Sequence, residues 1–389
     1  MNQGWEIKKL GEVGTFQRGG GFLKSDFVEN GFPCIHYGQI HTRLGVKTYK
    51  HLTCITEELA FSKSKIAHSG DVIIAITSED VEGSCKCTAW LGGYDVAVGA
   101  HAAIYRHNLN PAFVAYYFNG AHFNFEKIKY ARGFKVVEIK PSDIEKISIK
   151  FPSLEEQERI VAELDCLSGI IERKREQLRE LDALAQSIFY QMFGDPITNE
   201  KGWKVKKLGE IATSQIGITY KPENVSDNDE GTIVLRSSNI QDNTLCFEDI
   251  VRVKCAIKEN KYVKDGDILM CSRNGSFRLV GKVAMIANLP ESMTYGAFMT
   301  IIRSPYQAYL FAFFKSPAFR AQLTTSKTAT INQITVKMLD EIKVALPPLT
   351  LQQEFADKIE AIEKQKELIK QSITQTEELF NSRMDYYFN

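Results

Sequence analysis

The stretch Trp5-Glu-Ile-Lys-Lys-Leu-Gly-Glu-Val13 returns as Trp203-Lys-Val-Lys-Lys-Leu-Gly-Glu-Ile211, 198 positions later. A second string, Gly70-Asp71-Val-Ile-Ile, returns as Gly266-Asp267-Ile-Leu-Met after 196 positions. Motifs that recur in the same order at a nearly fixed distance are the signature of an internal duplication. The chain of 389 residues is therefore predicted to be one structural unit written twice.

Each predicted unit begins with a segment of about 150 residues, which is a usual size for a domain and which we call the front of the unit. These fronts carry short apolar runs bounded by Gly, Asp and Asn, which favour strands at 72–76, 233–235, 268–270 and 282–287. The front closes with a proline motif, Phe151-Pro152-Ser153-Leu154 in the first unit and Leu346-Pro347-Pro348-Leu349 in the second. Gln157 and Gln352 follow these motifs at matching positions.

A long helix is expected after each proline motif. Ser153-Leu-Glu-Glu156 has the pattern of a capping box, in which the serine and the glutamate each bond the other's amide. Apolar residues then recur at alternating steps of three and four, which is a heptad stripe interrupted at Lys174 and Lys366. The stripe residues that we predict to pack are Ile160, Leu164, Leu167, Ile171, Leu178 and Leu181 in the first helix and Phe355, Ile359, Ile362, Ile369 and Ile373 in the second.

A helix of about 36 residues is about 54 Å long, too long to bury its stripe on one small domain. Each helix is therefore expected to pack on the other, and an antiparallel pair would keep the two fronts apart. The alternative is that each helix packs separately on its own domain. The predicted fold class is mixed α/β (α+β), a pseudo-twofold repeat of two recognition domains (1–152 and 195–348) separated by two long antiparallel coiled-coil helices (153–194 and 349–389).

The composition is that of a soluble globular protein, with 44% hydrophobic and 25% charged residues. No apolar run approaches the roughly 18 residues that span a bilayer, and Met1–Leu10 lacks the features of a signal peptide, so we expect a cytoplasmic protein with no membrane contact. Eight scattered cysteines suit a reducing compartment, and the Cys85-Lys-Cys87 spacing is not that of a zinc site, so no metal is expected. Basic residues exceed acidic ones by three in 1–150 and by five in 196–348, whereas both helical segments are acidic.

Motifs for catalysis are missing from the sequence. There is no Gly-x-x-x-x-Gly-Lys-Ser/Thr phosphate loop and no Asn-Pro-Pro-Tyr or Asp-Pro-Pro-Tyr string of an amino-methyltransferase. All seven histidines lie in the first unit, so no histidine mechanism can be common to both. We expect no enzymatic activity and no cofactor in this chain.

The two units differ in polar segments that follow predicted strands. Cys34-Ile-His-Tyr-Gly-Gln-Ile40 corresponds to Val234-Leu-Arg-Ser-Ser-Asn-Ile240, and Thr77-Ser-Glu-Asp80 is matched with Ser272-Arg-Asn-Gly275. Arg reads guanine edges and Asn or Gln reads adenine edges, so one frame with two unlike sets of readers suits a protein that reads two DNA sequences. The residues that we predict to contact DNA are Arg18, Tyr37, Gln39, Ser78, Arg132, Lys135, Arg236, Ser238, Asn239, Arg273, Asn274 and Lys327.

These motifs, in this order and twice over, resemble the specificity subunits of type I restriction-modification systems along nearly the whole chain. The resemblance rests on the Trp and Leu-Gly-Glu openings, the Arg-x-x-Asn-Ile string at 236–240, the Gly-Asp strands and the Leu-Pro-Pro-Leu-x-x-Gln helix entry at 346–352. The first unit departs from this pattern, because His36-Tyr-Gly-Gln39 replaces Arg-x-x-Asn.

The resemblance implies a sequence-specific DNA-binding subunit that reads a bipartite, asymmetric site in double-stranded DNA. It implies two modification (methyltransferase) subunits that bring S-adenosylmethionine, and restriction (motor-nuclease) subunits that bring ATP and Mg²⁺. Two alternatives stay open at this point: a stand-alone DNA methyltransferase or nuclease with an unrecognised site, and a coiled-coil scaffold without a nucleic-acid role.

Overall fold

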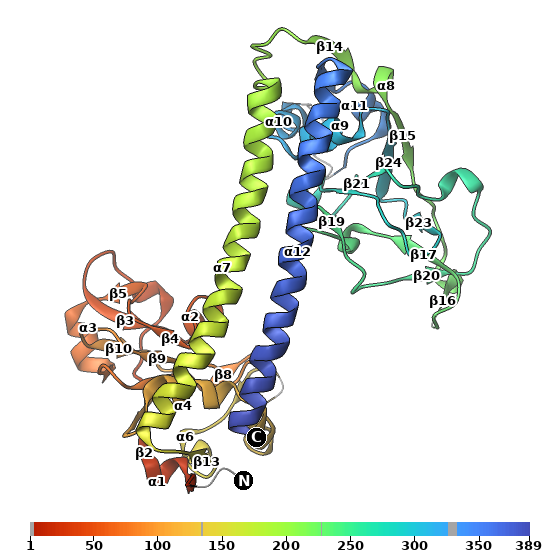
Figure 1. Cartoon of the computed structure of the whole chain (residues 1–389). Helices are drawn as coiled ribbons and strands as arrows, with labels where there is room; N and C mark the ends of the chain where they lie inside the picture. Colours follow the sequence, from red (N-terminus) through yellow and green to blue (C-terminus); the bar gives the residue numbers. More distant parts are fainter. Residues whose placement is uncertain (1–3, 134, 227, 326–332) are drawn as a thin grey trace. The chain divides into compact units, whose positions relative to one another are not determined.

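A computed structural model of the chain describes residues 4–133, 135–226, 228–325 and 333–389. Its contacts group the chain into two compact units: unit 1 is Met1–Glu176 with Lys370–Asn389, and unit 2 is Gln177–Ile369. The two long helices, α7 (Leu154–Phe193) and α12 (Leu349–Phe388), lie within the predicted helical segments, and each contributes one part to each unit (Figure 1). No helix in the described ranges is both long and apolar enough to cross a membrane.

Unit 1 is built on two main sheets, and its apolar runs form the inner strands. The five-stranded sheet has the order β2 (Gly14–Arg18), β11 (Ala102–His107), β7 (Val72–Ala75), β9 (Cys87–Trp90) and β4 (Lys47–Thr48). The four-stranded sheet has the order β5 (Thr53–Ile55), β3 (Phe32–Ile35), β10 (Val96–Val98) and β6 (Lys65–Ala67). Two short ladders pair β1 (Glu6–Lys9) with β13 (Ser148–Phe151) and β8 (Thr77–Ser78) with β12 (Val137–Glu138). The short helices are α1 (Leu10–Val13), α2 (Tyr37–Thr42), α3 (Glu57–Lys63), α4 (Pro111–Asn119), α5 (Ala121–Lys127) and α6 (Pro141–Ile144).

Unit 2 repeats this plan. One sheet has the order β15 (Thr213–Ile216), β24 (Met299–Arg303), β21 (Ile268–Cys271) and β22 (Val283–Met285). The other has the order β16 (Val225–Ser226), β20 (Arg252–Val253), β17 (Thr232–Leu235) and β23 (Met293–Tyr295). Ladders pair β14 (Lys204–Lys207) with β25 (Lys343–Leu346) and β18 (Ile240–Gln241) with β19 (Thr244–Leu245). The short helices are α8 (Leu208–Ile211), α9 (Gln307–Lys315), α10 (Pro317–Thr325) and α11 (Val336–Asp340).

The duplication predicted from sequence is thus confirmed in the central strands of both sheets. In unit 1, β10 pairs in parallel with β3, and in unit 2, β23 pairs in parallel with β17. The centre of the other sheet is antiparallel in both, with β11 between β2 and β7 and β24 between β15 and β21. The predicted strands at 72–76, 233–235, 268–270 and 282–287 are present as β7, β17, β21 and a shorter β22.

The repeated Gly-Asp motif closes the turn before β7 and before β21. Asp71 accepts a hydrogen bond from the amide of His68 at 2.8 Å, and Asp267 accepts one from the amide of Lys264 at the same distance. Asp267 also holds Arg303 through two contacts of 2.7 and 2.8 Å. An aspartate recurs here because it both caps a turn and neutralises an arginine from the neighbouring strand.

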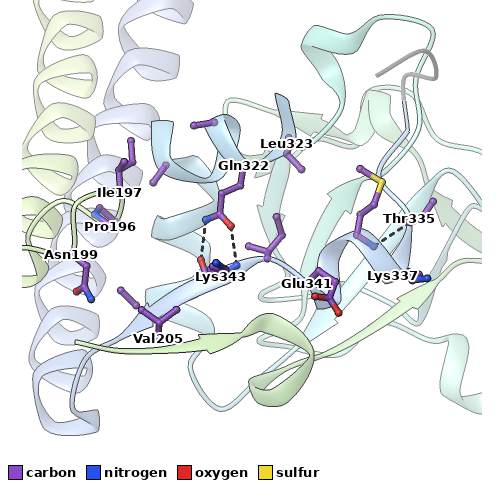
Figure 2. A pocket seen from close by; sticks show the side chains of 15 residues that line it. Pro196, Ile197, Asn199, Val205, Gln322, Leu323, Thr335, Lys337, Glu341 and Lys343 are labelled. Carbon is purple, nitrogen blue, oxygen red and sulfur yellow. Dashed lines mark hydrogen bonds between the residues drawn. The ribbon is translucent and has the colours of Figure 1, made fainter. Parts of the chain in front are cut away.

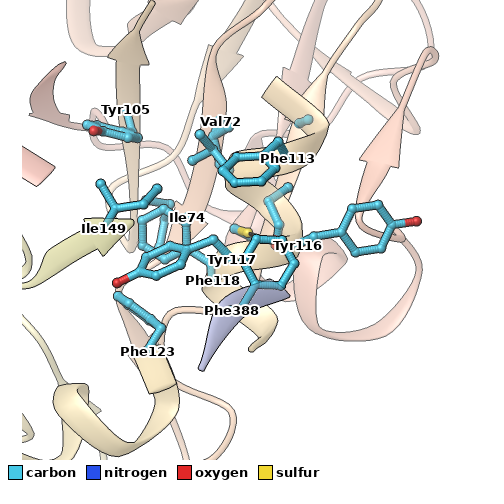
Figure 3. Close-up of a cluster of buried hydrophobic side chains, with 14 of the residues drawn as sticks. Val72, Ile74, Tyr105, Phe113, Tyr116, Tyr117, Phe118, Phe123, Ile149 and Phe388 are labelled. Atoms are coloured by element: carbon cyan, nitrogen blue, oxygen red, sulfur yellow. Dashed lines mark hydrogen bonds between the residues drawn. The ribbon is translucent and has the colours of Figure 1, made fainter. Parts of the chain in front are cut away.

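Aromatic side chains fasten a helix end into the core of each unit. In unit 1, Phe388 from the end of α12 lies 5.1 Å from Phe113 between ring centroids, within the cluster that includes Val72 and Ile74 (Figure 3). In unit 2, Phe193 from the end of α7 packs against Tyr309 of α9 at 4.9 Å. Burying a large aromatic ring is among the strongest single contributions to a core, so each helix end is tied to its unit.

The helices pair in antiparallel fashion, as contacts inside each unit show. In unit 1, Lys174 bonds Ser372 and Glu163 pairs with Arg383. Residue numbers therefore increase along α7 in the direction in which they decrease along α12. In unit 2, Asp182 pairs with Lys366. The helices therefore contact one another as well as their own domains, and the expected antiparallel pairing is confirmed.

The heptad stripe faces inward along both helices. All the stripe residues predicted to pack are buried or half-buried: Ile160, Leu164, Leu167, Ile171, Leu178, Leu181, Phe355, Ile359, Ile362, Ile369 and Ile373. The two interruptions, Lys174 and Lys366, meet polar partners on the opposite helix. Polar groups at single stripe positions are a known means of fixing the register of a helix pair.

The predicted capping box at the start of α7 is half right. The hydroxyl of Ser153 accepts from the amide of Glu156 at 3.4 Å, as expected. The carboxylate of Glu156 does not complete the box; it pairs with Arg159 one turn later, with contacts of 2.8 and 2.6 Å. A bidentate arginine is the stronger partner, because both groups are charged.

Candidate nucleic-acid interface

Three loops meet at corresponding places in the two units. We call residues 36–41, 76–80 and 99–101 loop cluster 1, and residues 236–239, 272–276 and 296–298 loop cluster 2. The same backbone bonds tie both clusters to the sheets. The amide of Gly99 donates to the carbonyl of Ile35 at 3.2 Å, and that of Gly296 donates to Leu235 at 3.0 Å. The sheets thus bring together three segments that are distant in sequence.

Loop cluster 1 is aromatic and rich in imidazole. The ring of Tyr37 lies 4.5 Å from His36 and 5.0 Å from His101, between centroids. Nε2 of His41 lies 3.0 Å from the carbonyl oxygen of Thr77, so that nitrogen carries the proton. Burial, with smaller effects of the positive Lys24 and of His101, lowers the pKa of His36 to about 4. His36 is therefore neutral near pH 7, and its Nδ1 accepts from the amide of Gly38 at 3.1 Å.

Loop cluster 2 presents hydrogen-bond donors. Arg273 is exposed, and its guanidinium lies over the ring of Phe298 at 5.2 Å from the centroid. The amide of Asn274 donates to the hydroxyl of Ser237 at 2.9 Å, which joins two of the loops. A guanidinium group that lies over an aromatic ring keeps N–H groups available to a further acceptor.

Arg236 is also held in place on this surface. Its Nη2 donates to Asp249 at 2.6 Å, and its Nε is buried with no hydrogen-bond partner among the described residues. A hydrogen bond from Ser238 and the charge of Arg236 lower the pKa of Asp249. Arg236 and Ser238, two of the predicted readers, therefore share one carboxylate.

The structure shifts one of the predicted correspondences by one residue. The amide of Ile76 donates to the carbonyl of His101, and the equivalent bond is made by Ser272 to Phe298. Thr77 therefore corresponds to Arg273, and Ser78 to Asn274, rather than Thr77 to Ser272. The error arose because the two units are offset by slightly different distances along the chain.

Gln39 and Asn239 have a structural position that their residue type did not reveal. The side-chain oxygen of Gln39 accepts from the amide of His36 at 3.0 Å, and that of Asn239 accepts from the amide of Arg236 at 2.8 Å. Their amide nitrogens donate to Thr53 and to the carbonyls of Cys246 and Asp249. Gln39 is 8% exposed and Asn239 is fully buried, so both amides hold the loop and are not presented to a base.

Of the other predicted contacts of unit 1, Ser78 belongs to loop cluster 1, and Arg18 donates to the carbonyl of Ala100 in that cluster at 3.3 Å. Arg18 is half exposed and pairs with Glu138 at 3.0 Å, and Ser78 lies in β8 opposite Val137. Arg132 is exposed and pairs with Asp143 at 3.1 Å, and Lys135 is exposed on the segment that leads into β12. Lys327 of unit 2 lies outside the described residues.

Two members of the clusters were not predicted from the sequence. His101 follows the repeated Gly99-Ala100 and Phe298 follows Gly296-Ala297, and each contacts a predicted reader, Tyr37 and Arg273 respectively. The sequence did contain a signal for these two residues: they differ between the two units, although the Gly-Ala motif directly before them is the same in both. Their contacts with the other loops could not be seen without the fold.

A pocket of about 710 Å³ lies elsewhere on unit 2 (Figure 2). It is lined by the turn that contains Pro196 and Ile197, by α10, by α11 and by β25. The side-chain amide of Gln322 donates to the carbonyl of Lys343 and accepts from its amide, each at 2.9 Å. In the described ranges no three His, Cys, Asp or Glu side chains are grouped so that they could hold a metal ion.

The chain is similar to known proteins in both of its units. The model of the type I restriction modification DNA specificity domain matches it twice, at residues 2–182 and 200–378. The chain is 30% identical over 169 residues to the type I restriction enzyme EcoKI specificity subunit of Escherichia coli, an alignment that covers 42% of this chain and 36% of that relative.

Solved structures share the fold along the whole chain. A chain from a study of complex assembly and conformational transition of the type I R-M system matches with a TM-score of 0.60 and 20% identity, covering 100% of this chain and 98% of the other. The type I restriction-modification S subunit of M. genitalium matches with a TM-score of 0.56 and 13% identity, covering 100% and 97%. Because the family model covers both units, the chain belongs to the type I restriction-modification DNA specificity family.

Proposed function

We propose that this chain is the specificity subunit of a type I restriction-modification complex and that each loop cluster reads one half of a bipartite, asymmetric DNA site. The observation that carries the proposal is the pairing of one scaffold with two unlike clusters. Equivalent backbone bonds hold both, from Gly99 to Ile35 and from Gly296 to Leu235, but the side chains they present differ in kind.

The chemistry of loop cluster 2 suits purine edges. Arg236 and Arg273 carry guanidinium groups that can bond the O6 and N7 acceptors of guanine, and Asn274 can bond adenine. Asp249 and Phe298 hold the two arginines without using all their donors. A reader that is held in place before binding loses less side-chain entropy when it meets the base.

Loop cluster 1 suits a different half-site. Its 77–80 segment carries the exposed carboxylates Glu79 and Asp80, which can accept from the N4 amino group of cytosine. Tyr37, His41 and His101 add apolar and imidazole surface, including a contact surface for a thymine methyl group. The two halves of the site would therefore differ in sequence, as an asymmetric site requires.

The finer part of the proposal concerns partners. We propose that two modification subunits bind this chain and bring S-adenosylmethionine, and that restriction subunits bring ATP and Mg²⁺. The chain itself then performs no chemistry and supplies sequence recognition in the cytoplasm. Its formal net charge of zero suits a subunit that binds DNA tightly only together with such partners, because phosphate contacts dominate the affinity of a stand-alone binder.

The experiment is to map adenine methylation in cells that carry the chain with its modification subunit, with either protein alone, and with neither. We expect one bipartite, asymmetric methylated motif that requires both proteins. Methylation by the chain alone would show that the chain is itself an enzyme. The same methylated motif with the partner alone would show that the chain does not supply sequence recognition. A motif that is the same in both halves would contradict the assignment of different readers to the two clusters.

A further inference from the structure

The loop that carries readers from the central sheet ends in the same backbone conformation in both units. Cys85 has a φ of 62° and Gly281 has a φ of 84°, both in the left-handed region. The amide of Cys85 donates to Ala75 and that of Gly281 to Cys271, each at 2.8 Å. Glycine adopts this conformation without strain, but cysteine does not, so unit 1 must hold its loop end by other contacts.

A buried lysine contacts this loop end in unit 1. Lys127, the last residue of α5, is 2% exposed. Its Nζ donates to the carbonyls of Ser84 at 2.6 Å and Glu82 at 2.9 Å. Burial lowers the pKa of Lys127, although Cys85 and Glu82 act in the opposite direction. Burying an amino group is costly unless it is hydrogen-bonded, and here the bonds go to the loop.

Unit 2 binds the equivalent carbonyl with a different residue. Nη1 of Arg320, in α10, donates to the carbonyl of Val280 at 2.6 Å. Val280 directly precedes Gly281, as Ser84 precedes Cys85.

The two cations do not correspond in the repeat. The equivalent short helices α5 and α10 are 196 positions apart, so Lys127 corresponds to the buried Leu323 and Arg320 to Asn124. The side chain of Asn124 bonds the carbonyls of Asn119 and Gly120 instead. Each unit has thus placed a cation on the same loop carbonyl from a different helix position. Because the same carbonyl is bound from two different helix positions, we infer that it is the loop that needs this hydrogen bond.

We propose that Lys127 and Arg320 are positioning residues for DNA recognition, each fixing the loop that presents the readers of its own unit. The inference rests on the proposed function and adds two residues that contact no base. The tips of these loops, which carry Glu79 and Asp80 in unit 1 and Arg273 in unit 2, are exposed, whereas the held ends are buried. A tip that is anchored at one buried point can be placed against a groove; a loose tip would sample many positions.

The test uses the full chain assembled with its modification subunits and a DNA library with single-base changes in each half-site. With Lys127→Met, discrimination against wrong bases should fall about tenfold in one half-site, comparable to losing one good base contact, and stay unchanged in the other. Lys127→Arg should restore it. Lys129→Met is the matched control, because Lys129 is exposed on the same segment and pairs with Glu126 at 2.6 Å.

Arg320→Met should relax the opposite half-site, with rescue by Arg320→Lys. Equal loss in both half-sites, or unchanged discrimination with both methionine variants, would overturn the inference. If Lys127→Met does not assemble, the half-buried Arg320 decides the question. Failure of the proposed function is a separate result, since it would appear as absence of site-specific methylation with the unsubstituted chain.

Discussion

The two loop clusters share their backbone bonds and differ in their side chains. Both are fastened to the central sheet by the bond from Ile76 to His101 or from Ser272 to Phe298. Cluster 1 then presents rings and carboxylates, and cluster 2 presents guanidinium groups. Comparing the two clusters separates the residues that hold the loops from the residues that vary in order to contact different bases. Two residues that resemble base-reading residues in sequence belong to the first group.

Those two are Gln39 and Asn239. Their positions vary between the units, as positions that read bases should, yet both side chains bond the backbone three residues earlier. The exchange of Gln for Asn keeps the amide and adjusts the length of the side chain. Variation between repeats therefore marks readers only where the side chain is exposed, as with Arg273.

The largest expected effect concerns the scaffold, at the repeated Gly-Asp motif. Asp267→Ala should lower the free energy of unfolding of unit 2 by about 2–4 kcal/mol, below the usual cost of breaking a fully buried pair because Arg303 is partly exposed. Asp71→Ala should cost unit 1 only about 1–2 kcal/mol, because Arg106 contacts Asp71 once, at 3.3 Å, and is more exposed than Arg303. Urea titration measures both, with Trp203 as the tryptophan of unit 2.

Asp267→Asn is the control, because its amide oxygen can still accept from the amide of Lys264, whereas the charge and one of the two acceptors for Arg303 are lost. Asp267→Asn should fall between the wild-type chain and Asp267→Ala. A larger loss for Asp71→Ala than for Asp267→Ala would show that the two motifs do not differ as their contacts indicate.

The next effect concerns the readers. Arg273→Ala should cost about 1–3 kcal/mol of discrimination in one half-site if its guanidinium makes a bidentate base contact, and should leave the other half-site unchanged. Phe298→Ala removes only the ring beneath Arg273 and should give a smaller loss at the same base pair. Methylation rates on half-site variants provide the measurement.

Lys254→Ala is the matched control in unit 2, because Lys254 is exposed and pairs with Glu230 at 2.6 Å outside loop cluster 2. If Arg273→Ala weakened binding equally on all sequences, Arg273 would position the phosphate backbone and would not read a base.

The smallest effect concerns the helices. Lys366 of unit 2 stands at the repeat position of Ile171 in unit 1, and it is only 7% exposed. Burial alone would lower the pKa of Lys366, but hydrogen bonds with Asp182 and Glu363 outweigh burial and raise it.

Lys366→Ile makes the two units alike at this position. The carboxylates of Asp182 and Glu363 are exposed, so removing Lys366 leaves no buried charge without a partner, and the free energy of unfolding should change by less than about 1 kcal/mol. Lys364→Ile, on the exposed face of the same helix, is the control. A loss above about 2 kcal/mol would mean that the helix pair depends on this charge contact.

The sequence by itself determined the duplication, the main strands and both long helices. It could do so because these features depend on local periodicity, on capping and turn residues and on the order of motifs along the chain. The bounds of α7 and α12 and the inward face of their stripe follow from residues only a few positions apart. The missing catalytic motifs were likewise visible in the sequence.

Only the tertiary structure decided which polar residues are exposed and which are buried. Gln39 and Arg273 both follow apolar strands, yet Gln39 is enclosed by segments that the sheet brings to it and Arg273 is not. The cations on the loop ends, Lys127 and Arg320, lie about 40 residues from the carbonyls they hold. Burial and such distant bonds depend on the packing of the whole unit, which no local pattern of residues specifies.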